Sequence, residues 1–413
     1  MGKGVRVGMF LVAMLILLGV GINGEIKSQK ELLEVQRRLK ILNKPPIKSI
    51  KSEDGDIIDC VDIYKQPAFD HPALKSHTIQ MSPSFNLLNR IKTNQSATTV
   101  IPQKWQKTGT CPKGTIPIRR NQEGDLFRAR SFESYGRKNQ SVRDTKTNTT
   151  KPIRNNVQYY FPQENVSLSY LLTQGYSYIG AQADINLWNP HLESNDEYSS
   201  GQIWLRNGPP NFYESVESGW VVNPIVYGDR QTRFFAYWTA DSSKSTGCFD
   251  LTCPGFVQTS HEIALGASFD AVSQERGNQY HTQISLYLDP KTKHWWLQCQ
   301  GINVGYWPGE FFSLLNRNAL YVMFGGEVYS PRIRKTPHTS THMGSGYWPE
   351  GLFQQACFIR HIRVMDYSCS WKFPEWIYAG TDEEYCYRAR LNTGYTIEPE
   401  FYFGGPGQNP TCP

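Results

Sequence analysis

From about residue 157 onward, short runs of alternating apolar and polar residues are separated by Gly, Asn, Asp and Pro. The alternation is clearest at residues 181–187, 202–205 and 284–288. Successive side chains of a strand point to opposite faces of a sheet, so a period of two is typical of strands with one buried face. Closely spaced turn residues favour antiparallel neighbours. We therefore expect a mainly β fold, an antiparallel β-sandwich, from about residue 160 to the C-terminus.

The segment near the N-terminus has a helical period instead. Ser28 and Glu31 form a capping-box pattern, and a pair of prolines ends the repeat. Because one short amphipathic helix needs a surface to pack on, we expect it to dock on the sandwich or on the small mixed domain around it. The helix is predicted over residues 28–42, from apolar residues at helical spacing: Leu32, Val35, Leu39 and Leu42.

Between the helix and the sandwich the chain is mixed and polar. Residues 137–156 have almost no apolar side chains, which is typical of an exposed linker that a protease can cut. We therefore expect two units, a small mixed N-terminal domain with its linker at residues 25–150 and the sandwich at residues 151–413.

The first 24 residues resemble a targeting signal. Lys3 and Arg6 precede an apolar run at residues 7–22, and small residues follow it, which is the pattern of a secretory signal peptide. A membrane anchor is the alternative, but the run is short for a spanning helix. We expect a secreted, extracellular protein with no stable membrane insertion after cleavage.

The charge of the chain limits its partners. The 413 residues have a formal net charge of +6, and Lys and Arg form no dense run beyond short clusters such as Arg119-Arg120. Nucleic-acid-binding domains usually concentrate basic residues on one face, so we expect no nucleic-acid partner. A mild basic excess favours acidic peptides or acidic wall polysaccharide instead.

Nine cysteines in a secreted chain predict disulfide bonds with one residue left over. Zinc binding is the alternative, but the chain has no CxxC or HExxH spacing, so we expect no metal and no cofactor. Three residues, Cys299, Cys357 and Cys369, are not paired by the sequence. The expected pairs close a tight loop, tie down the C-terminal tail and staple the N-terminal region: Cys248 with Cys253, Cys386 with Cys412, and Cys60 with Cys111.

Four glycosylation sequons agree with a secretory route. Their clustering between residues 94 and 167 indicates an exposed junction between the two units. The acceptor positions are Asn94, Asn139, Asn148 and Asn165.

The local motifs of serine and cysteine hydrolases are absent, and two glutamates stand out by their surroundings. Glu217 and Glu327 each lie in an apolar, aromatic or Gly-rich segment that reads as a strand. Burial makes an ionised carboxylate costly, and a buried pair can hold two different pKa values, one suited to an acid and one to a base. The alternative is that each glutamate faces solvent or pairs with Arg or Lys. Glycines beside Glu327 would let a substrate backbone approach closely.

Long runs of the chain resemble the neprosin family of plant proteins. Two runs match that family's activation peptide: residues 54–72 (DGDIIDCVDIYKQPAFDHP) and 111–120 (CPKGTIPIRR). The other runs match its C-terminal part: 202–204 (QIW), 219–220 (GW), 237–241 (YWTAD), 255–259 (GFVQT), 305–308 (GYWP), 325–328 (GGEV) and 402–407 (YFGGPG). The chain departs from the family at His342, where Gln is usual, at residues 347–348, and at the three unassigned cysteines.

The resemblance implies a β-sandwich glutamic endopeptidase that prefers to cut after proline and is made with an inhibitory N-terminal domain. We expect it to be a monomer, in an extracellular space such as the plant apoplast or a digestive fluid. The catalytic glutamates of the family fall on Glu217 and Glu327. One ionised glutamate would activate a water and the other, protonated, would stabilise the oxyanion, with the roles unassigned. Gln202 is a candidate polar helper in the cleft. Two carboxylates that share a proton favour acid pH.

Three other interpretations of the sequence stay open. Paired glutamates on an aromatic-rich sandwich also suit a glycoside hydrolase or a glycan-binding wall protein. A catalytically inactive family member is the third reading. If the chain is a peptidase, peptides are its substrates and its own propeptide is its intramolecular inhibitor. Acid is then expected to release that propeptide, with His71, His77 and residues 54–62 as candidate sensors.

Overall fold

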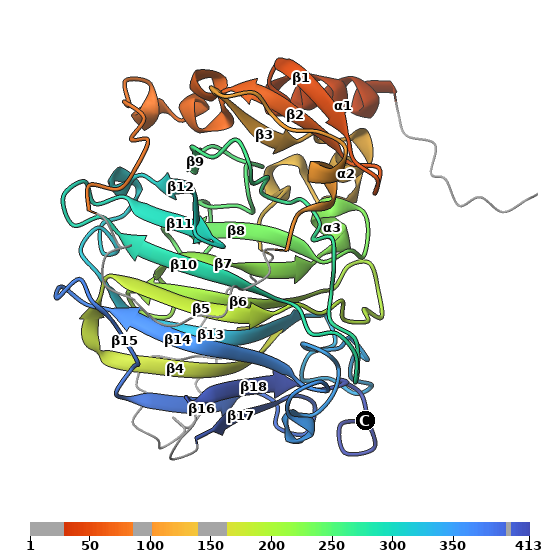
Figure 1. The fold of residues 1–413 in the computed structure, drawn as a ribbon. Helices are drawn as coiled ribbons and strands as arrows, with labels where there is room; N and C mark the ends of the chain where they lie inside the picture. The colour runs from red at the N-terminus through yellow and green to blue at the C-terminus, as the bar shows by residue number, and fades with distance from the viewer. Residues whose placement is uncertain (1–28, 86–100, 139–162, 394–397) are drawn as a thin grey trace, which may run out of the picture.

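A computed structural model describes residues 29–85, 101–138, 163–393 and 398–413 (Figure 1). The described residues form three antiparallel sheets, of which the two larger ones belong to residues 166–404. In Figure 1 the strands of these two sheets run in roughly the same direction and form one stack, with the N-terminal elements at one end of it. The predicted mainly β fold with an antiparallel sandwich is confirmed.

The sheet that carries the candidate site has six strands in the order β16-β4-β13-β6-β7-β8. All pairings in it are antiparallel. Its strands are β4 (Val166–Tyr178), β6 (Tyr198–Asn207), β7 (Glu214–Val222), β8 (Arg233–Thr239), β13 (Ala319–Tyr329) and β16 (Ile377–Thr381).

The second sheet has nine strands, of which eight follow the order β17-β18-β14-β5-β10-β11-β12-β9 and the ninth, β15, pairs with β14. Its strands are β5 (Gly180–Asn186), β9 (Val257–Gln258), β10 (His281–Leu288), β11 (Trp295–Cys299), β12 (Ile302–Trp307), β14 (Cys357–Met365), β15 (Trp371–Lys372), β17 (Arg388–Asn392) and β18 (Glu400–Gly404).

The two-residue period of the sequence separates the two faces of the six-stranded sheet. In β6, Ile203 and Leu205 belong to the large core between the sheets, whereas Trp204 belongs to a second apolar cluster. The same division holds in β13, where Phe324 joins the core and Met323 joins the second cluster. The face that carries this second cluster is called here the outer face of the sheet.

The N-terminal domain, at described residues 29–85 and 101–138, is built on a three-stranded sheet. The predicted helix is confirmed as α1 (Gln29–Leu42); Ser28 lies outside the described residues. Val35 of α1 is buried against Leu126 and Tyr135, so the helix packs on its own domain. The domain also contains β1 (Pro46–Lys51), β2 (Ile57–Asp62), β3 (Thr115–Arg119) and α2 (Glu123–Arg128), together with several short 3-10 helices.

The N-terminal domain covers the edges of both large sheets, next to β8 and β9 (Figure 1). Ile118 bridges to Leu265, and Gln103 bridges to Phe269. The side chain of Gln66 accepts from the backbone N–H of Gln258 in β9 at 2.7 Å. Unpaired sheet edges are prone to association with other chains, so this arrangement protects the sandwich as well as fixing the domain in place.

Several expectations concern residues outside the described ranges. The predicted signal peptide, most of the predicted linker and the boundary at residues 150 and 151 all lie there and stay predictions. None of the helices formed by the described residues has the length and apolar character needed to cross a bilayer.

Candidate active site

Glu217 and Glu327 lie on one face of the six-stranded sheet, on the two strands that flank β6. Glu217 of β7 is opposite Trp204, and Glu327 of β13 is opposite Ser200. Ser200 and Trp204 are four residues apart in one strand and therefore point to the same face. Both glutamates are almost completely buried, at 1% and 2% exposure. The two glutamates predicted from the sequence are thus brought together on the outer face.

The ammonium of Lys138 lies between the two carboxylates. Its Nζ is 2.7 Å from Glu217 Oε2, 3.0 Å from Glu327 Oε1 and 3.1 Å from Glu327 Oε2. The same nitrogen lies 5.0 Å from the ring centre of Tyr237, within cation–π range. Lys138 comes from the end of the N-terminal domain. It was expected to lie in an exposed linker, and that prediction is wrong at this residue, because its side chain is only 5% exposed.

Several further groups donate hydrogen bonds or positive charge to Glu217. Ser215 donates to Oε1 at 2.7 Å, and Gln202 donates to Oε2 at 2.9 Å. The Arg206 guanidinium lies 3.5 Å from Oε1. Ser215 and Glu217 are two residues apart on one strand, so the alternation that buries the glutamate also orients the serine toward it.

Glu327 has a different set of neighbours. Tyr198 donates to Oε1 at 2.5 Å, and its ring stacks on Tyr329 with centroids 5.3 Å apart. Burial and then the nearby Glu327 charge raise the pKa of the Tyr198 hydroxyl well above its usual value, so this hydroxyl keeps its proton and remains a donor.

The charges of Lys138 and the two glutamates stabilise one another. Burial opposes ionisation of Glu217, but Lys138 and then Arg206 outweigh it and hold the pKa of that carboxyl below its usual value. Burial likewise opposes the charge on Lys138, but Glu217 and Glu327 outweigh it and raise the pKa of the ammonium. An ion pair of this kind is retained inside a protein only when the geometry satisfies both partners, as it does here.

Gln202, the candidate helper, lies in β6 between the strands of the two glutamates. Its amide donates to Glu217, and its carbonyl oxygen accepts from Ser200 Oγ at 2.7 Å. The serine fixes which end of the amide faces the carboxylate. The alternative, a solvated glutamine on the sheet surface, does not apply, because the side chain is 1% exposed.

The glycines before Glu327 have a structural explanation. A Cβ on Gly325 would lie 2.1 Å from the carbonyl oxygen of Ser169 in β4, and a Cβ on Gly326 would lie 2.6 Å from the ring of Phe403. Close approach of the neighbouring strand therefore requires Gly325, and close packing inside the sandwich requires Gly326. Access for a substrate backbone is not needed to explain them.

Four residues at the site were not predicted from the sequence: Lys138, Tyr198, Arg206 and Ser215. Lys138 left no local signal, because it reaches Glu217 from 79 positions earlier in the chain. Ser215 was the easiest of the four to predict from the sequence, since a residue two positions before a glutamate in a strand must lie on the same face of the sheet.

The three disulfides are the pairs expected from the sequence. Their S–S distances are those of covalent bonds and their Cα atoms are 5.3–6.0 Å apart, within the usual range. Cys299 and Cys357 are buried free thiols, and Cys369 is a partly buried one. Burial raises the pKa of Cys299 to about 11 and that of Cys357 well above its usual value, so both behave as inert core thiols. The bonds are Cys60–Cys111, Cys248–Cys253 and Cys386–Cys412.

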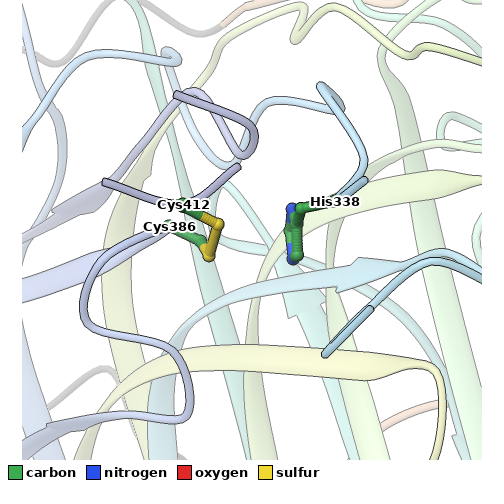
Figure 2. A group of neighbouring side chains, drawn as sticks. All are labelled: His338, Cys386 and Cys412. Atoms are coloured by element: carbon green, nitrogen blue, oxygen red, sulfur yellow. A yellow bond between two sulfur atoms is a disulfide. The ribbon is translucent and has the colours of Figure 1, made fainter. Parts of the chain in front are cut away.

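One cluster among the described residues has the composition of a metal site, namely His338 with Cys386 and Cys412. Figure 2 shows that the two sulfur atoms are bonded to each other beside the histidine ring. A disulfide offers no thiolate to a metal. His338 is instead paired with Glu383, whose Oε1 lies 3.3 Å from its Nε2.

Of the predicted glycosylation positions, only Asn165 lies in a described range. It adopts a left-handed backbone conformation (φ 61°) directly before β4, and its carbonyl accepts from Ser330 N at 2.9 Å. Asn94, Asn139 and Asn148 lie outside the described residues. Glycosylation at all four positions stays a prediction.

A buried ion pair fastens the N-terminal domain to the sandwich. Arg233 of β8 is fully buried, and its guanidinium contacts Asp56 at 2.5 Å and Asp229 at 2.5 Å. Arg119 also reaches Asp56, at 3.0 Å. In the same segment, Asp54 accepts a hydrogen bond from Ser268 Oγ. These acidic residues, which could have been solvated, are therefore part of the contact between the domains.

A second contact is made by residues 77–84, which lie on β12 and the turn after β10. Asp289 accepts from Gln80 Nε2 at 3.0 Å, Ser84 N at 2.7 Å and Ser84 Oγ at 2.5 Å. Burial opposes its ionisation, but the hydrogen bonds from Ser84 outweigh burial and lower the pKa of Asp289 to about 2. His77 Nε2 lies 2.7 Å from the Tyr306 hydroxyl, and the His77 ring is 5.5 Å from that of His294.

Comparison with known families agrees with this two-part architecture. Residues 195–406 match the family model described as Neprosin, and residues 49–163 match the one described as Neprosin activation peptide. The chain belongs to the neprosin family. Lys138, which bridges the two glutamates, falls inside the stretch matched to the activation peptide. The activation peptide of this neprosin-family chain and its sandwich therefore meet at Glu217 and Glu327.

Solved structures resemble the chain only weakly. Scytalido-glutamic peptidase with a transition state analog inhibitor matches at 10% identity and a TM-score of 0.33, covering 57% of this chain and 97% of that one. CG-16, a homodimeric agglutinin from chicken liver, matches at 9% identity and a TM-score of 0.21, covering 39% and 95%. A β-porphyranase from the human gut bacterium Bacteroides plebeius matches at 9% identity and a TM-score of 0.20, covering 38% and 53%.

Proposed function

We propose that this chain is the latent precursor of a secreted glutamic endopeptidase, with Glu217 and Glu327 as its catalytic pair. The observation that carries the proposal is the position of Lys138, whose ammonium contacts both buried carboxylates and which belongs to the matched activation peptide. A buried pair of acidic groups is the chemistry that an acid–base hydrolase needs. A positive charge supplied by an activation peptide is a direct way to keep such a pair inactive.

Latency follows from the electrostatics of this contact. General acid catalysis needs a carboxyl group that carries a proton, whereas the Lys138 ammonium holds the pKa of Glu217 below its usual value and so favours the ionised form. Lys138 also fills the position between the carboxylates where a water and a peptide carbonyl would have to meet. The unprocessed chain therefore lacks both the correct protonation state and room for substrate.

Removal of the activation peptide would leave a competent pair. Without Lys138, two neighbouring carboxylates share a proton, because both cannot stay ionised at close range. The ionised glutamate takes a proton from water, and the resulting hydroxide attacks the peptide carbonyl. The protonated glutamate hydrogen-bonds the oxygen as it becomes negative, and a proton then passes to the leaving nitrogen. No covalent intermediate with the enzyme is formed.

Gln202, Ser215 and Tyr198 would position the pair during this reaction. Gln202 and Ser215 hold the carboxylate of Glu217, and Tyr198 holds that of Glu327. Substrates are proposed to be peptides or proteins cut after proline at acid pH. The enzyme would be a secreted monomer without a metal or other cofactor.

The proposal is tested by incubating the purified full chain between pH 3 and pH 7 and following it by mass spectrometry. Self-processing that removes the activation peptide, followed by cleavage of a proline-containing peptide, is the expected result. A parallel incubation with plant wall glycans tests the glycoside-hydrolase reading. Failure to cut any peptide after the activation peptide has been removed would reject the peptidase proposal and leave an inactive or glycan-binding family member.

A further inference from the structure

Trp204 lies next to the candidate catalytic pair on the outer face of the sheet. It is directly opposite Glu217 in β7 and opposite Met323 in β13, and Met323 is in turn opposite Leu172 in β4. Residues opposite one another in antiparallel strands share a face, with Cβ atoms roughly 4.5–5.5 Å apart. An apolar row therefore runs from Glu217 across three strands.

The indole N–H of Trp204 has no hydrogen-bond acceptor, although the side chain is fully buried. A buried donor without a partner costs roughly 1–3 kcal/mol, and buried tryptophans usually find an acceptor. Trp220, on the inner face of the same sheet, does so by donating to the carbonyl of Asn186 at 2.9 Å. The indole N–H of Trp204 thus lacks an acceptor beside the glutamates, where the carbonyl groups of a peptide substrate would lie.

Two other described tryptophans have buried, unpaired indole N–H groups, but neither is on the outer face. Trp238 belongs to the core between the sheets, where its ring stacks on Phe311 with centroids 5.0 Å apart. Trp296 is in β11 of the other sheet, where its ring lies 4.8 Å from that of Tyr306. Trp204 therefore differs from these two tryptophans, whose indole N–H groups also lack an acceptor, because it lies beside the glutamates.

We propose that Trp204 is a substrate-binding residue, which donates its indole N–H to a peptide carbonyl and offers its ring, with Met323 and Leu172, to an apolar side chain beside the scissile bond. The inference rests on the proposed peptidase function and adds a specificity-determining residue to it. Prolyl rings pack well on aromatic faces, and proline-rich peptides are held by aromatic grooves in general. The ligand class is thus a peptide with proline at the subsite next to Glu217.

The test compares Trp204→Phe, Trp204→Leu and Trp238→Phe with the wild type, all after processing. Two peptides that differ only in Pro or Ala before the scissile bond are assayed for kcat and KM. Phe keeps an aromatic face without a donor, so KM should rise about tenfold for both peptides, the effect of one lost hydrogen bond. Leu removes the aromatic face as well, so the Pro-to-Ala ratio of kcat/KM should fall about fivefold or more.

Trp238→Phe is the matched control, because it also removes a buried, unpaired indole N–H but on the inner face. It should leave KM and the Pro-to-Ala ratio unchanged. If the wild type is active and both Trp204 variants keep its KM and its Pro-to-Ala ratio of kcat/KM, the role of Trp204 is overturned and the peptidase proposal stands. An inactive wild type would instead reject the peptidase proposal.

A measurement without substitution at Trp204 covers the case in which its variants do not fold. Glu327→Gln protein, labelled with ¹⁵N and processed in trans by the wild type, is titrated with a proline-containing peptide. An indole N–H resonance should shift downfield as the donor gains an acceptor. Peptide binding that leaves every indole N–H resonance in place would overturn the inference.

Discussion

The Nζ of Lys138 lies 2.7 Å from Oε2 of Glu217, so a residue of the activation peptide forms a buried ion pair with a strand of the sandwich. The same nitrogen reaches Glu327 on a second strand. Removing one charge from this group would leave others buried without full compensation, which is strongly unfavourable. The contact therefore links the position of the activation peptide to the ionised form of Glu217 and places its charge against both glutamates.

Lys138→Met should weaken latency. Methionine has a similar length but no charge, so the pair can take up a proton at a higher pH. An opposite charge within hydrogen-bond distance lowers the pKa of a carboxyl by roughly 1–3 units, so the pH of half-maximal self-processing should rise by about 1 unit. The measurement is the rate at which the full chain is converted to the shorter form between pH 3 and pH 7.

Arg137→Met is the control for Lys138→Met, because it removes the same charge from the neighbouring position. Its processing profile should match that of the wild type. If the two variants behaved alike, the effect would come from the net charge of the segment, and the specific contact of Lys138 with the glutamates would have no part in latency.

Glu217→Gln and Glu327→Gln should each abolish peptide cleavage. Gln keeps the shape and most hydrogen bonds of Glu but cannot exchange a proton, and loss of acid–base catalysis costs roughly 10²–10⁴-fold in rate. The two losses should not add, because each glutamate acts only with the other. Each variant is processed in trans by the wild type, checked for folding by circular dichroism, and assayed on a proline-containing peptide.

The control for these variants is Glu384→Gln, which removes an exposed carboxylate far along the chain from either strand. It should retain wild-type activity. Substantial cleavage by a folded Glu217→Gln or Glu327→Gln protein would remove that glutamate from the mechanism.

The sequence predicts the sandwich and the two glutamates because both depend on local pattern. Alternation in β6 alone assigns Ile203 and Leu205 to the core and Trp204 to the other face. A glutamate in such a strand is conspicuous, since its neighbours predict burial that a carboxylate resists. The pairing of Cys248 with Cys253 is equally local, because only five positions separate the two residues.

The contacts between the activation peptide and the sandwich are not predictable in this way. Asp56 and Arg233 are 177 positions apart, and nothing near either residue specifies the other. Lys138 lies in a segment whose polar composition is typical of a solvated linker, and its burial follows only from the two charges that it meets. Composition describes the average environment of a segment, whereas a buried ion pair depends on one partner brought close by the fold.

Asp56→Ala should loosen the activation peptide. Asp56 is the partner of the fully buried Arg233, and loss of one member of a buried ion pair costs roughly 3–5 kcal/mol. We expect a lower midpoint of thermal unfolding for the full chain and faster self-processing at a given acid pH. Asp70→Ala is the matched control, since its pair with Lys44 is largely at the surface and is worth under about 1 kcal/mol. Equal effects of the two changes would contradict the role of Asp56.

We expect the histidines of the contact between the domains to make it sensitive to mild acid. Burial lowers the pKa of His77 and of His294, against the weaker opposite effect of Glu310, so the closed contact favours neutral rings. The groups that face His77 are the Tyr306 hydroxyl, the His294 ring and the Glu310 carboxylate. A group whose pKa is depressed in the closed state stabilises it above its free pKa, and this stabilisation is lost as the pH falls. For a histidine the loss begins near pH 6.5.

His77→Gln should therefore make release of the activation peptide less sensitive to pH below about 6.5. Glutamine can still hydrogen-bond to Tyr306 but takes up no proton, so the slope of the opening equilibrium against pH should fall by up to about one proton. The measurement is hydrogen exchange of the backbone amides of residues 72–85 between pH 5 and pH 7, which reports the opening directly. It is made in the Glu327→Gln background, so that the chain does not cleave itself.

His361→Gln, a change in a histidine paired with Asp184 in the sandwich, serves as the control and should keep the wild-type slope. An unchanged slope in His77→Gln would assign the pH response to the carboxylates, Asp54 and Asp289 among them.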